Sequence, residues 1–260
     1  MATVGIVGST GRVGNLLIDS LLEDEMLPLS AVHVFDELKK DLPENVLVTN
    51  SMKALLENCD VVIDFSAPQA TQELCEAALE NPTPLVIATT GFTEHQQNLM
   101  MEASKEMPLL YASNMSAGIA LLKQLVEKVA ATLEDFDIEI VEQHHKHKVD
   151  APSGTALRMG EVVADALGRD LETCAVYGRE GRTGERDRNT IGFTTIRAGD
   201  IVGDHTVMFA AEGERMEITH KASSRMTFAL GAMRASSWLM SYQTGLYDMQ
   251  DVLGLHDHNN

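Results

Sequence analysis

The sequence predicts an α/β fold, in which a doubly wound parallel sheet is joined to a second α+β domain built on an open mixed sheet. Two observations predict it. In the first 133 residues, short apolar runs alternate with segments whose apolar residues recur at helical spacing, which is typical of a parallel sheet with its connecting helices. Further along the chain, strand-like runs follow one another without helices between them, which favours an antiparallel or mixed sheet.

The alternating region supplies the elements of the parallel sheet. Strands are expected at Val4–Val7, Ala31–Phe35, Val61–Phe65, Leu85–Ala88 and Leu109–Tyr111. Helices are expected at Gly11–Leu22, Met52–Asn58, Ala70–Leu79, Glu94–Glu106 and Ser116–Leu133. Helices placed between parallel strands cover both faces of the sheet, so ligands are expected beyond the carboxyl ends of the strands.

A glycine-rich turn joins the first strand to the first helix, with the sequence Gly8-Ser9-Thr10-Gly11-Arg12-Val13-Gly14. This context is typical of the dinucleotide-binding turn of Rossmann-like folds. There, glycines let the backbone approach the pyrophosphate and the helix N-terminus stabilises its charge. The spacing is G-x-x-G-x-x-G, with Ser9 at the position where the standard pattern has a glycine. Because many strand-to-helix turns use glycine only to turn, the loop alone is weak support.

An acid near the end of the next strand supports a nucleotide site. Asp36 follows the apolar run Ala31–Phe35 and lies 22 positions after Gly14, where a carboxylate can bind the adenine ribose hydroxyls of NAD. The alternative is a solvated acid, in a chain that holds 39 Asp and Glu residues. Lys39 and Lys40 lie close enough to meet a 2′-phosphate. The sequence therefore predicts NADH or NADPH as the cofactor.

Small and polar segments follow three later strands of the predicted sheet. They are Asp64 to Pro68 (DFSAP), Thr89 to Phe92 (TTGF) and Ala112 to Ser116 (ASNMS). On the carboxyl edge of a parallel sheet, three such loops beside the glycine turn favour a cofactor groove. Taken singly, each loop also fits ordinary turn chemistry, with Ser116 as a helix N-cap and Pro68 in a first helical turn.

The second region opens on a strand with one exposed face, because Phe136, Ile138 and Ile140 alternate with acids. A helix is expected at Ser153–Leu167, followed by a Gly/Arg-rich stretch from Tyr177 to Arg188. We interpret that stretch as a mobile, solvated linker, although its arginines can also hold a carboxylate. Further strands are expected at Ile191–Arg197, His205–Ala211 and Met216–Lys221, and a last helix at Phe228–Tyr242.

The most informative segment is Glu142 to Ala156, EQHHKHKVDAPSGTA. From His144 to Lys148 it holds three histidines and two lysines, in a chain whose formal net charge is −19. A proline and a Ser-Gly-Thr turn then open the expected helix, whose N-terminal N–H groups attract anions. Cationic groups beside a helix N-terminus suit a small acidic substrate that must also be protonated. On an irregular loop, His144 and Lys148 can converge on one substrate ring.

A zinc site is the alternative use for His144, His145 and His147. No acidic or cysteine partner lies at a recurring ligand spacing, and the two lysines among the histidines would repel the ion. The sequence therefore predicts no metal centre.

Composition argues against several classes of function. The 39 acidic residues outnumber the 20 basic ones, which argues against nucleic acid or an anionic membrane as a partner. No apolar run is long enough for a transmembrane helix, and no signal peptide is visible. Three cysteines without metal-like or disulfide-like spacing indicate a reducing cytoplasm.

Over essentially its whole length the chain resembles the 4-hydroxy-tetrahydrodipicolinate reductase family, long called dihydrodipicolinate reductases. The most specific match is EQHHKHKVDAPSGTAL, and further motifs are GSTGRVG, DFSAP, TTGF, ASNMS, TIGFTTIRAGDIVGDHT and ITHKASSRMTF. The resemblance implies NAD(P)H-dependent reduction of 4-hydroxy-tetrahydrodipicolinate, via dihydrodipicolinate, to tetrahydrodipicolinate in diaminopimelate and lysine biosynthesis. It also implies a dinucleotide-binding domain of residues 1–115 and 225–260, and a substrate-binding domain of residues 116–224 that builds a homotetramer through its open sheet.

The resemblance assigns roles to individual residues. His144 would be the general acid/base and Lys148 a proton donor. A dicarboxylate substrate would be held by His145, Ser153, Gly154 and Thr155, although Ser153 to Thr155 can also cap the helix. The cofactor would be lined by Gly8, Ser9, Thr10, Gly11, Arg12, Val13, Asp36, Ala88, Thr89, Thr90, Ala112, Ser113, Asn114 and Met115. Ala88 departs from the family pattern, where glycine is more usual, and its methyl group would crowd the nicotinamide end slightly.

Two other functions fit the sequence less well. A short-chain dehydrogenase or sugar epimerase needs a Tyr-x-x-x-Lys pair, and none of the four tyrosines has a lysine four residues later. A non-catalytic NAD-sensing regulator needs a DNA- or partner-binding module, yet the chain has no basic helix and no spare domain.

Overall fold

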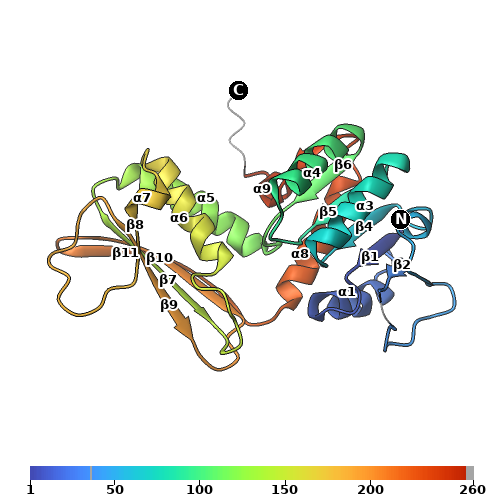
Figure 1. Ribbon diagram of the computed structural model, residues 1–260, viewed down its shortest axis with the longest axis horizontal. Coiled ribbons are helices and arrows are strands. Elements are labelled where there is room, and N and C mark those ends of the chain that lie inside the picture. Colours follow the sequence, from blue (N-terminus) through green and yellow to red (C-terminus); the bar gives the residue numbers. More distant parts are fainter. Residues whose placement is uncertain (36, 256–260) are drawn as a thin grey trace. The chain divides into compact units, whose positions relative to one another are not determined.

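The computed structural model describes residues 1–35 and 37–255, and Figure 1 shows the elements that they form. These residues group into two compact units. Unit 1 comprises Met1–Ala117 and the chain from Arg225 onward, whereas unit 2 comprises Gly118–Ser224. Unit 1 is therefore built from two segments far apart in the sequence, because the chain returns to it after completing unit 2.

Unit 1 is built on a seven-stranded sheet with the order β12-β6-β5-β4-β1-β2-β3. Among the described residues, every strand pairing in this sheet is parallel. The strands are β1 (Val4–Val7), β2 (Leu29–His33), β3 (Leu47–Thr49), β4 (Val61–Asp64), β5 (Leu85–Ile87), β6 (Pro108–Tyr111) and β12 (Gly245–Tyr247). The strand order reverses between β1 and β4, where doubly wound sheets bind their ligands. The predicted doubly wound parallel sheet is thereby confirmed.

Helices on the sheet of unit 1 present apolar residues to it. They are α1 (Arg12–Leu22), α2 (Met52–Leu56), α3 (Pro68–Glu80), α4 (Glu94–Glu106), α8 (Met226–Leu239) and α9 (Met249–Leu253). Leu74 of α3 packs with Ile87 and Leu109 of the strands in a fully buried core, and burial of such apolar surface is the main source of stability. The start of α4 follows from its sequence, because Thr93 and Gln96 form a capping box.

Two short strands of unit 1 have no counterpart in the sequence prediction. β3 and β12 have three residues each and are mostly half-buried, so neither is long enough to show a period. A third difference concerns β2, which ends at His33, whereas the prediction extended it to Phe35. Phe35 is exposed and lies beyond the last strand pairing of β2.

Unit 2 is built on a five-stranded mixed sheet with the order β11-β10-β7-β9-β8. Its strands are β7 (Asp137–His144), β8 (Ala175–Tyr177), β9 (Ile191–Arg197), β10 (Gly203–Ala211) and β11 (Glu214–Ala222). β10 runs antiparallel to both β7 and β11, whereas β9 runs parallel to both β7 and β8. The predicted mixed sheet is confirmed, although β8 was not predicted.

Helices lie on one side of this second sheet, as Figure 1 shows. They are α5 (Ala117–Thr132), α6 (Gly154–Ala166) and α7 (Leu171–Cys174). Ile140 and Val207 point from the sheet into a core that includes Val126 of α5 and Met159 of α6. Alternate residues of the same strands lie on the opposite side of the sheet. We call that side the open face and define it by Val141, Thr194, Thr206, Met208 and Thr219.

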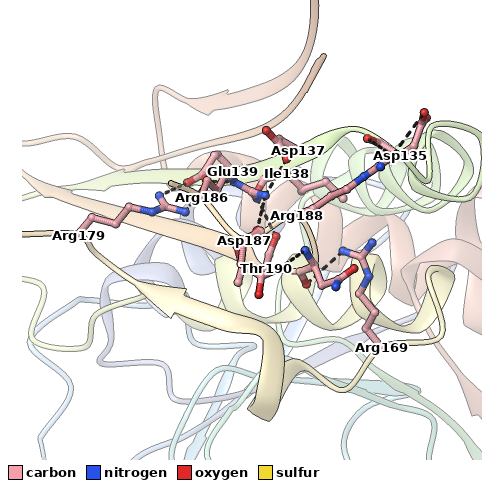
Figure 2. Close-up of polar contacts among 11 residues, drawn as sticks. Asp135, Asp137, Ile138, Glu139, Arg169, Arg179, Arg186, Asp187, Arg188 and Thr190 are labelled. Carbon is pink, nitrogen blue, oxygen red and sulfur yellow. Dashed lines mark hydrogen bonds and ion pairs between the residues drawn. The ribbon is translucent and has the colours of Figure 1, made fainter. Parts of the chain in front are cut away.

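The Gly/Arg-rich stretch is exposed over nearly all of its length, as the solvated interpretation predicts, but two of its arginines attach it to the sheet, so it is not a free linker. Figure 2 shows Arg179 and Arg186 directed at Glu139 of β7, which accepts hydrogen bonds from both guanidinium groups at 2.8–3.0 Å. Arg186 also binds the carboxylate of Asp137 at 2.8 Å and two backbone carbonyl oxygens. Burial would raise the pKa of Glu139, but the two arginines lower it below its ordinary value. These arginines do hold carboxylates, and the carboxylates belong to β7.

Candidate active site

The turn after β1 brings backbone atoms into close contact. Gly8 adopts a φ of +83°, and a Cβ atom there would lie 2.2 Å from the carbonyl oxygen of Phe65. A Cβ atom on Gly14 would lie 2.1 Å from the carbonyl oxygen of Gly8. Only glycine fits these positions, because a backbone oxygen cannot move aside without moving its strand or turn. The turn therefore packs closely against both α1 and the segment after β4, at the carboxyl edge of the sheet.

The N-terminus of α1 is suited to an anion. Gly11 is its N-cap residue and, within the described structure, no side chain caps the helix. The first N–H groups and the positive end of the helix dipole are therefore available to a pyrophosphate. Thr10 and Arg12 are exposed beside this end, and Val13 is half-buried. A close-packed glycine turn before an uncapped helix fits the dinucleotide that the sequence predicts.

Ser9 accounts for the departure from the standard glycine pattern. Its buried hydroxyl donates a 2.6 Å hydrogen bond to the carbonyl oxygen of His33, the last residue of β2. The serine therefore ties the turn to β2. Asp36, predicted to bind the ribose, lies outside the described residues. Lys40, considered as a partner for a 2′-phosphate, forms an ion pair with Asp19 of α1.

A buried carboxylate, Asp64 at the end of β4, connects two loops of this edge. It accepts hydrogen bonds from the backbone N–H of Ser66 at 3.0 Å and the hydroxyl of Thr89 at 3.1 Å, and also from the hydroxyls of Ser66 and Thr71. Burial raises the pKa of Asp64, and these donors offset part of the rise. Since the Thr89 hydroxyl is used to order the loops, its backbone is the part left for a ligand.

The other predicted cofactor residues lie on the loops after β5 and β6. Thr90 and Ser113 are exposed, Ala88 and Asn114 are half-buried, and Ala112 and Met115 are buried. Because β5 and β6 are parallel neighbours, both loops leave the same edge of the sheet. The exposed residues can meet a ligand through their side chains, whereas the buried ones can do so only through backbone atoms.

His144 is the last residue of β7, so the prediction of an irregular loop at this position is wrong. It shares the helix-covered face of the strand with Ile138, Ile140 and Glu142. Nδ1 of His144 lies 2.5 Å from Oε2 of Glu142, and both side chains are buried. Burial lowers the pKa of His144, and the adjacent Glu142 carboxylate opposes part of that change.

Lys148 lies on the loop after β7 and interacts with His144. Burial and Glu142 affect the pKa of His144 most, and the ammonium of Lys148 lowers that pKa further. Nζ of Lys148 forms a 2.8 Å ion pair with Oδ1 of Asp150. Of the neighbouring histidines, His145 is half-buried and His147 is exposed, with their ring centroids 6.2 Å apart. The two predicted proton carriers are therefore near enough for the charge of Lys148 to act on His144.

Helix α6 begins beside Glu142. The hydroxyl of Ser153 caps the helix by accepting the N–H of Ala156 at 3.2 Å, and the Ser153 N–H donates to Glu142 at 3.1 Å. Gly154 is exposed, and a Cβ atom there would meet nothing within 4 Å. Packing therefore does not require this glycine, whose bare backbone leaves room for an anion at the N-terminus of a 13-residue helix. Thr155 is half-buried in the same turn.

His205 of β10 supports this arrangement. The Ser153 hydroxyl, which caps α6, also shares a 3.0 Å hydrogen bond with Nε2 of His205. Burial, followed by the proximity of His144, lowers the pKa of His205 to about 4, so this ring is neutral near pH 7. The rings of His144 and His205 pack edge to face with centroids 5.1 Å apart.

Two residues of this site were not predicted from the sequence: Glu142 as a partner of His144, and Arg197 of β9, which binds Glu142. A signal for Glu142 was present, because residues two apart on a strand share a face. Arg197 carried no comparable signal. It meets this site because β9 pairs with β7 in a register that places Arg197 opposite His144.

Both halves of the sequence match one protein family. The family described as "Dihydrodipicolinate reductase, N-terminus" matches residues 2–115, and "Dihydrodipicolinate reductase, C-terminus" matches residues 118–253. The chain belongs to the dihydrodipicolinate reductase family. The resemblance inferred from the motifs is thereby confirmed.

Similar proteins cover the chain from end to end. The 4-hydroxy-tetrahydrodipicolinate reductase of Sulfurovum sp. (strain NBC37-1) is 64% identical over 98% of this chain and 100% of its own length. The enzyme of the same name from Wolinella succinogenes is 52% identical over 98% and 100%. The solved dipicolinate-bound dihydrodipicolinate reductase from Paenisporosarcina sp. TG-14 has the same fold, with a TM-score of 0.79, 23% identity, and coverage of 96% and 98%.

Family membership defines the reaction. The protein is an NAD(P)H-dependent oxidoreductase that reduces 4-hydroxy-tetrahydrodipicolinate in diaminopimelate and lysine biosynthesis. The predicted cofactor class and small-molecule substrate are confirmed. Neither the short-chain dehydrogenase nor the NAD-sensing regulator applies to this chain.

Two further observations concern the part of the chain that the structure describes. Within residues 1–35 and 37–255, histidine, cysteine and acidic side chains do not gather in threes in an arrangement that would hold a metal ion. None of the helices in these ranges is long and apolar enough to cross a membrane.

Proposed function

We propose that His144 and Lys148 supply the proton for this reduction, and that the N-terminus of α6 holds a substrate carboxylate. The placement of His144 supports this most directly, because it ends β7 beside a helix that has open space at Gly154, its first residue. An imidazole, an ammonium and a helix N-terminus in one place suit an anion that must be protonated.

Unit 1 would hold the cofactor. The turn 8–14 and the uncapped end of α1 would bind the pyrophosphate, Asp36 would bind the adenine ribose, and the loops after β5 and β6 would line the nicotinamide half. When bound, NADH or NADPH supplies the hydride that adds to the conjugated imine of the substrate. We expect both cofactors to be used, because Lys39 and Lys40 follow Asp36 in the sequence.

The protein's own contribution is the proton. Reduction of a cyclic imine moves electron density toward the ring nitrogen, where a nearby ammonium or imidazolium stabilises the charge and donates a proton. Burial lowers the pKa of His144 in the free protein. A bound dicarboxylate would favour the protonated form of His144, so substrate binding would prepare the acid.

The substrate carboxylates would be met by His145, Gly154 and Thr155. Gly154 would offer a backbone N–H, and Thr155 an N–H and a hydroxyl. Ser153 would act as the cap that keeps this turn in place, because its buried hydroxyl already binds Ala156 and His205. The Paenisporosarcina reductase with bound dipicolinate supports a site for a dicarboxylate ring.

The test is the oxidation of NADH, with NADPH in parallel, by the wild type and by the His144→Ala and Lys148→Ala variants. Substrate would be generated in situ from pyruvate and aspartate semialdehyde by the preceding synthase. We expect consumption that requires the synthase and depends on both residues. Variants that oxidise NADH at the wild-type rate would show that the proton comes from elsewhere.

We further propose that the open face of unit 2 joins four copies of the chain. Val141 lies on this face between Thr194 and Thr206, Met208 lies between Glu139 and Glu217, and both apolar side chains are half-buried in the single chain. An apolar centre on a strand-built surface is typical of a subunit interface.

We also propose a reducing, cytoplasmic location, which the free Cys59, Cys75 and Cys174 support.

Val141→Lys should dissociate this tetramer into smaller species, because its cross-strand neighbours Thr194 and Thr206 are uncharged and the new charge would be buried without a partner. Light scattering behind a sizing column would report the mass. Leu125→Lys, at an exposed apolar position on α5, is the matched control and should leave the mass unchanged. A Val141→Lys protein that keeps the mass of four chains would assign the interface to another surface.

A further inference from the structure

Arg197 stands where two parts of the candidate site meet. Its guanidinium donates to both oxygens of Glu142, with Nη1 to Oε2 at 2.9 Å and Nη2 to Oε1 at 2.7 Å. Nη2 also donates to the backbone carbonyl oxygen of Asp150 at 2.6 Å. The carboxylate of Asp150 in turn holds Lys148 at 2.8 Å. One side chain of β9 is therefore connected to both proposed proton carriers, through Glu142 to His144 and through Asp150 to Lys148.

Glu142 is fully occupied as an acceptor. Besides Arg197 and His144, it accepts the Ser153 N–H and the Thr195 hydroxyl, both at 3.1 Å. Burial would raise the pKa of Glu142, but Arg197 and His144 lower it to about 2, so the group stays a carboxylate at every working pH. A carboxylate can only accept, and therefore the proton of the hydrogen bond to His144 resides on Nδ1.

We propose that Glu142 and Arg197 are a positioning pair that holds His144 in the Nδ1–H tautomer, leaves its Nε2 to exchange the proton with substrate, and anchors the loop that carries Lys148. This deepens, and rests on, the proposed role of His144 in proton transfer. Neither member of the pair touches the substrate. Their effect on the reaction is exerted through the orientation and protonation of the two groups that do.

The space beside Nε2 of His144 supports this assignment. A Cβ atom at Gly203, the first residue of β10, would lie 3.0 Å from Nε2. The glycine therefore leaves room at the one ring nitrogen that the carboxylate does not occupy. A ring turned the other way would place Nδ1 on that side and leave Glu142 without its histidine donor, at the cost of an unmet bond to a buried charge.

The charged and titratable groups that face His144 come from each neighbouring element. They are Glu142 on its own strand, Arg197 on β9, His205 on β10 and Lys148 on the following loop. Burial lowers the pKa of His144 most, Glu142 raises it, and the cations Lys148 and Arg197 lower it further. Removing the charge of Glu142 alone therefore removes the opposing influence, and the pKa of His144 should fall.

Glu142→Gln tests the proposal because it keeps the shape of the side chain and removes its charge. The amide would donate to Nδ1, so neutral His144 should change from the Nδ1–H to the Nε2–H tautomer. The ring ¹⁵N shifts, assigned against a His144→Gln protein, report this change and the pKa of His144 without any turnover. We expect kcat to fall by about 100-fold, at the lower end of a general acid–base contribution, with the KM for NADH unchanged.

Further variants distinguish a positioning role of Glu142 and Arg197 from a general loss of folded structure. Arg197→Lys keeps the charge but cannot bind both oxygens of Glu142 and the Asp150 carbonyl together, so kcat should fall by about 10-fold, less than in Glu142→Gln. Thr195→Val removes one neutral hydrogen bond from Glu142 and should move the ring shifts in the same direction by a smaller amount. Glu161→Gln breaks an exposed ion pair with Arg158 on α6 and serves as the control, with wild-type kcat and ring shifts.

The wild-type spectrum alone can overturn the proposal, even if Glu142→Gln fails to fold. A neutral His144 that carries its proton on Nε2 would contradict it, as would ring shifts and a pH–rate profile that Glu142→Gln leaves unaltered. The proposed function fails differently: His144→Ala would then keep the wild-type rate, while the spectrum still showed the Nδ1–H tautomer.

Discussion

His144→Ala and Lys148→Ala should each lower kcat by about 10²- to 10⁴-fold, the usual contribution of one general acid or base. Both residues belong to the same unit and interact, since the ammonium of Lys148 influences the pKa of His144. On the proposed mechanism, loss of either one would remove a proton source at the point where negative charge develops on the substrate nitrogen. The affinity for NADH should be unchanged, because the predicted cofactor residues lie in unit 1. Steady-state kinetics and NADH fluorescence titration measure the two quantities separately.

His147→Ala is the matched control for this pair. It removes an exposed histidine from the same basic segment and should leave kcat within about twofold of wild type, as is usual for surface substitutions. The pH dependence supplies a second criterion. If Lys148→Ala gave the pH–rate profile of the wild type, Lys148 would not be the group that transfers the proton.

Lys148→Arg distinguishes proton donation from charge alone. Arginine keeps the positive charge and can bind Asp150, but its guanidinium does not release a proton at working pH. A proton-donating Lys148 therefore predicts a loss of kcat close to that of Lys148→Ala. Recovery of most of the rate in Lys148→Arg would instead assign the residue a purely electrostatic role.

The parallel sheet was predictable because its central strands are buried on both faces. Val61–Asp64 reads as a continuous apolar run that ends in one acid, and the following helices carry clear helical periods. Strands β3 and β12 have only three residues each, too few for any period to emerge. They join the sheet through backbone pairing with β2 and β6, which a local pattern does not reveal.

The end of β7 shows why the site was harder to predict than the fold. The alternation that begins at Ile138 continues through Ile140 to Glu142 and His144, all on the inner face. Polar residues at inner positions hide this continuation, because a hydrophobic period identifies a strand only while its inner residues are apolar. The alternation is therefore readable only as far as Ile140, and His144 is expected on a loop. The chemistry of the segment was readable from its composition, but its geometry was not.

Contacts between residues far apart in the sequence could not be predicted from local patterns either. Arg197 lies 55 positions from Glu142 in the sequence, and their contact follows from the pairing of β7 with β9. Ser9 posed a different problem, since a serine within a glycine pattern suggests a weaker nucleotide site. Its hydroxyl in fact closes the turn against β2, so the departure has a structural cause.

Gly14→Ala should abolish most NADH binding and destabilise unit 1. The added Cβ atom would lie 2.1 Å from the Gly8 carbonyl oxygen and 2.9 Å from Cα of Ser9. Both contacts are to backbone, so α1 must move away from the turn. We expect a loss of at least the ~1–3 kcal/mol that overpacking costs. We also expect NADH affinity at least about tenfold lower, equal to about 1.4 kcal/mol, because the helix N-terminus would no longer meet the pyrophosphate.

Gly154→Ala is the matched substitution in unit 2, and it should have the opposite profile. Its Cβ atom would enter open space at the start of α6, so the free energy of unfolding should stay within about 1 kcal/mol of wild type, since alanine is the better helix former. That space is where a substrate carboxylate would approach, so the KM for substrate should rise about tenfold while NADH affinity is kept. Urea unfolding, NADH titration and substrate kinetics on both variants test the pair together. Equal effects of the two alanines on all three measurements would contradict the assignment of cofactor to one turn and substrate to the other.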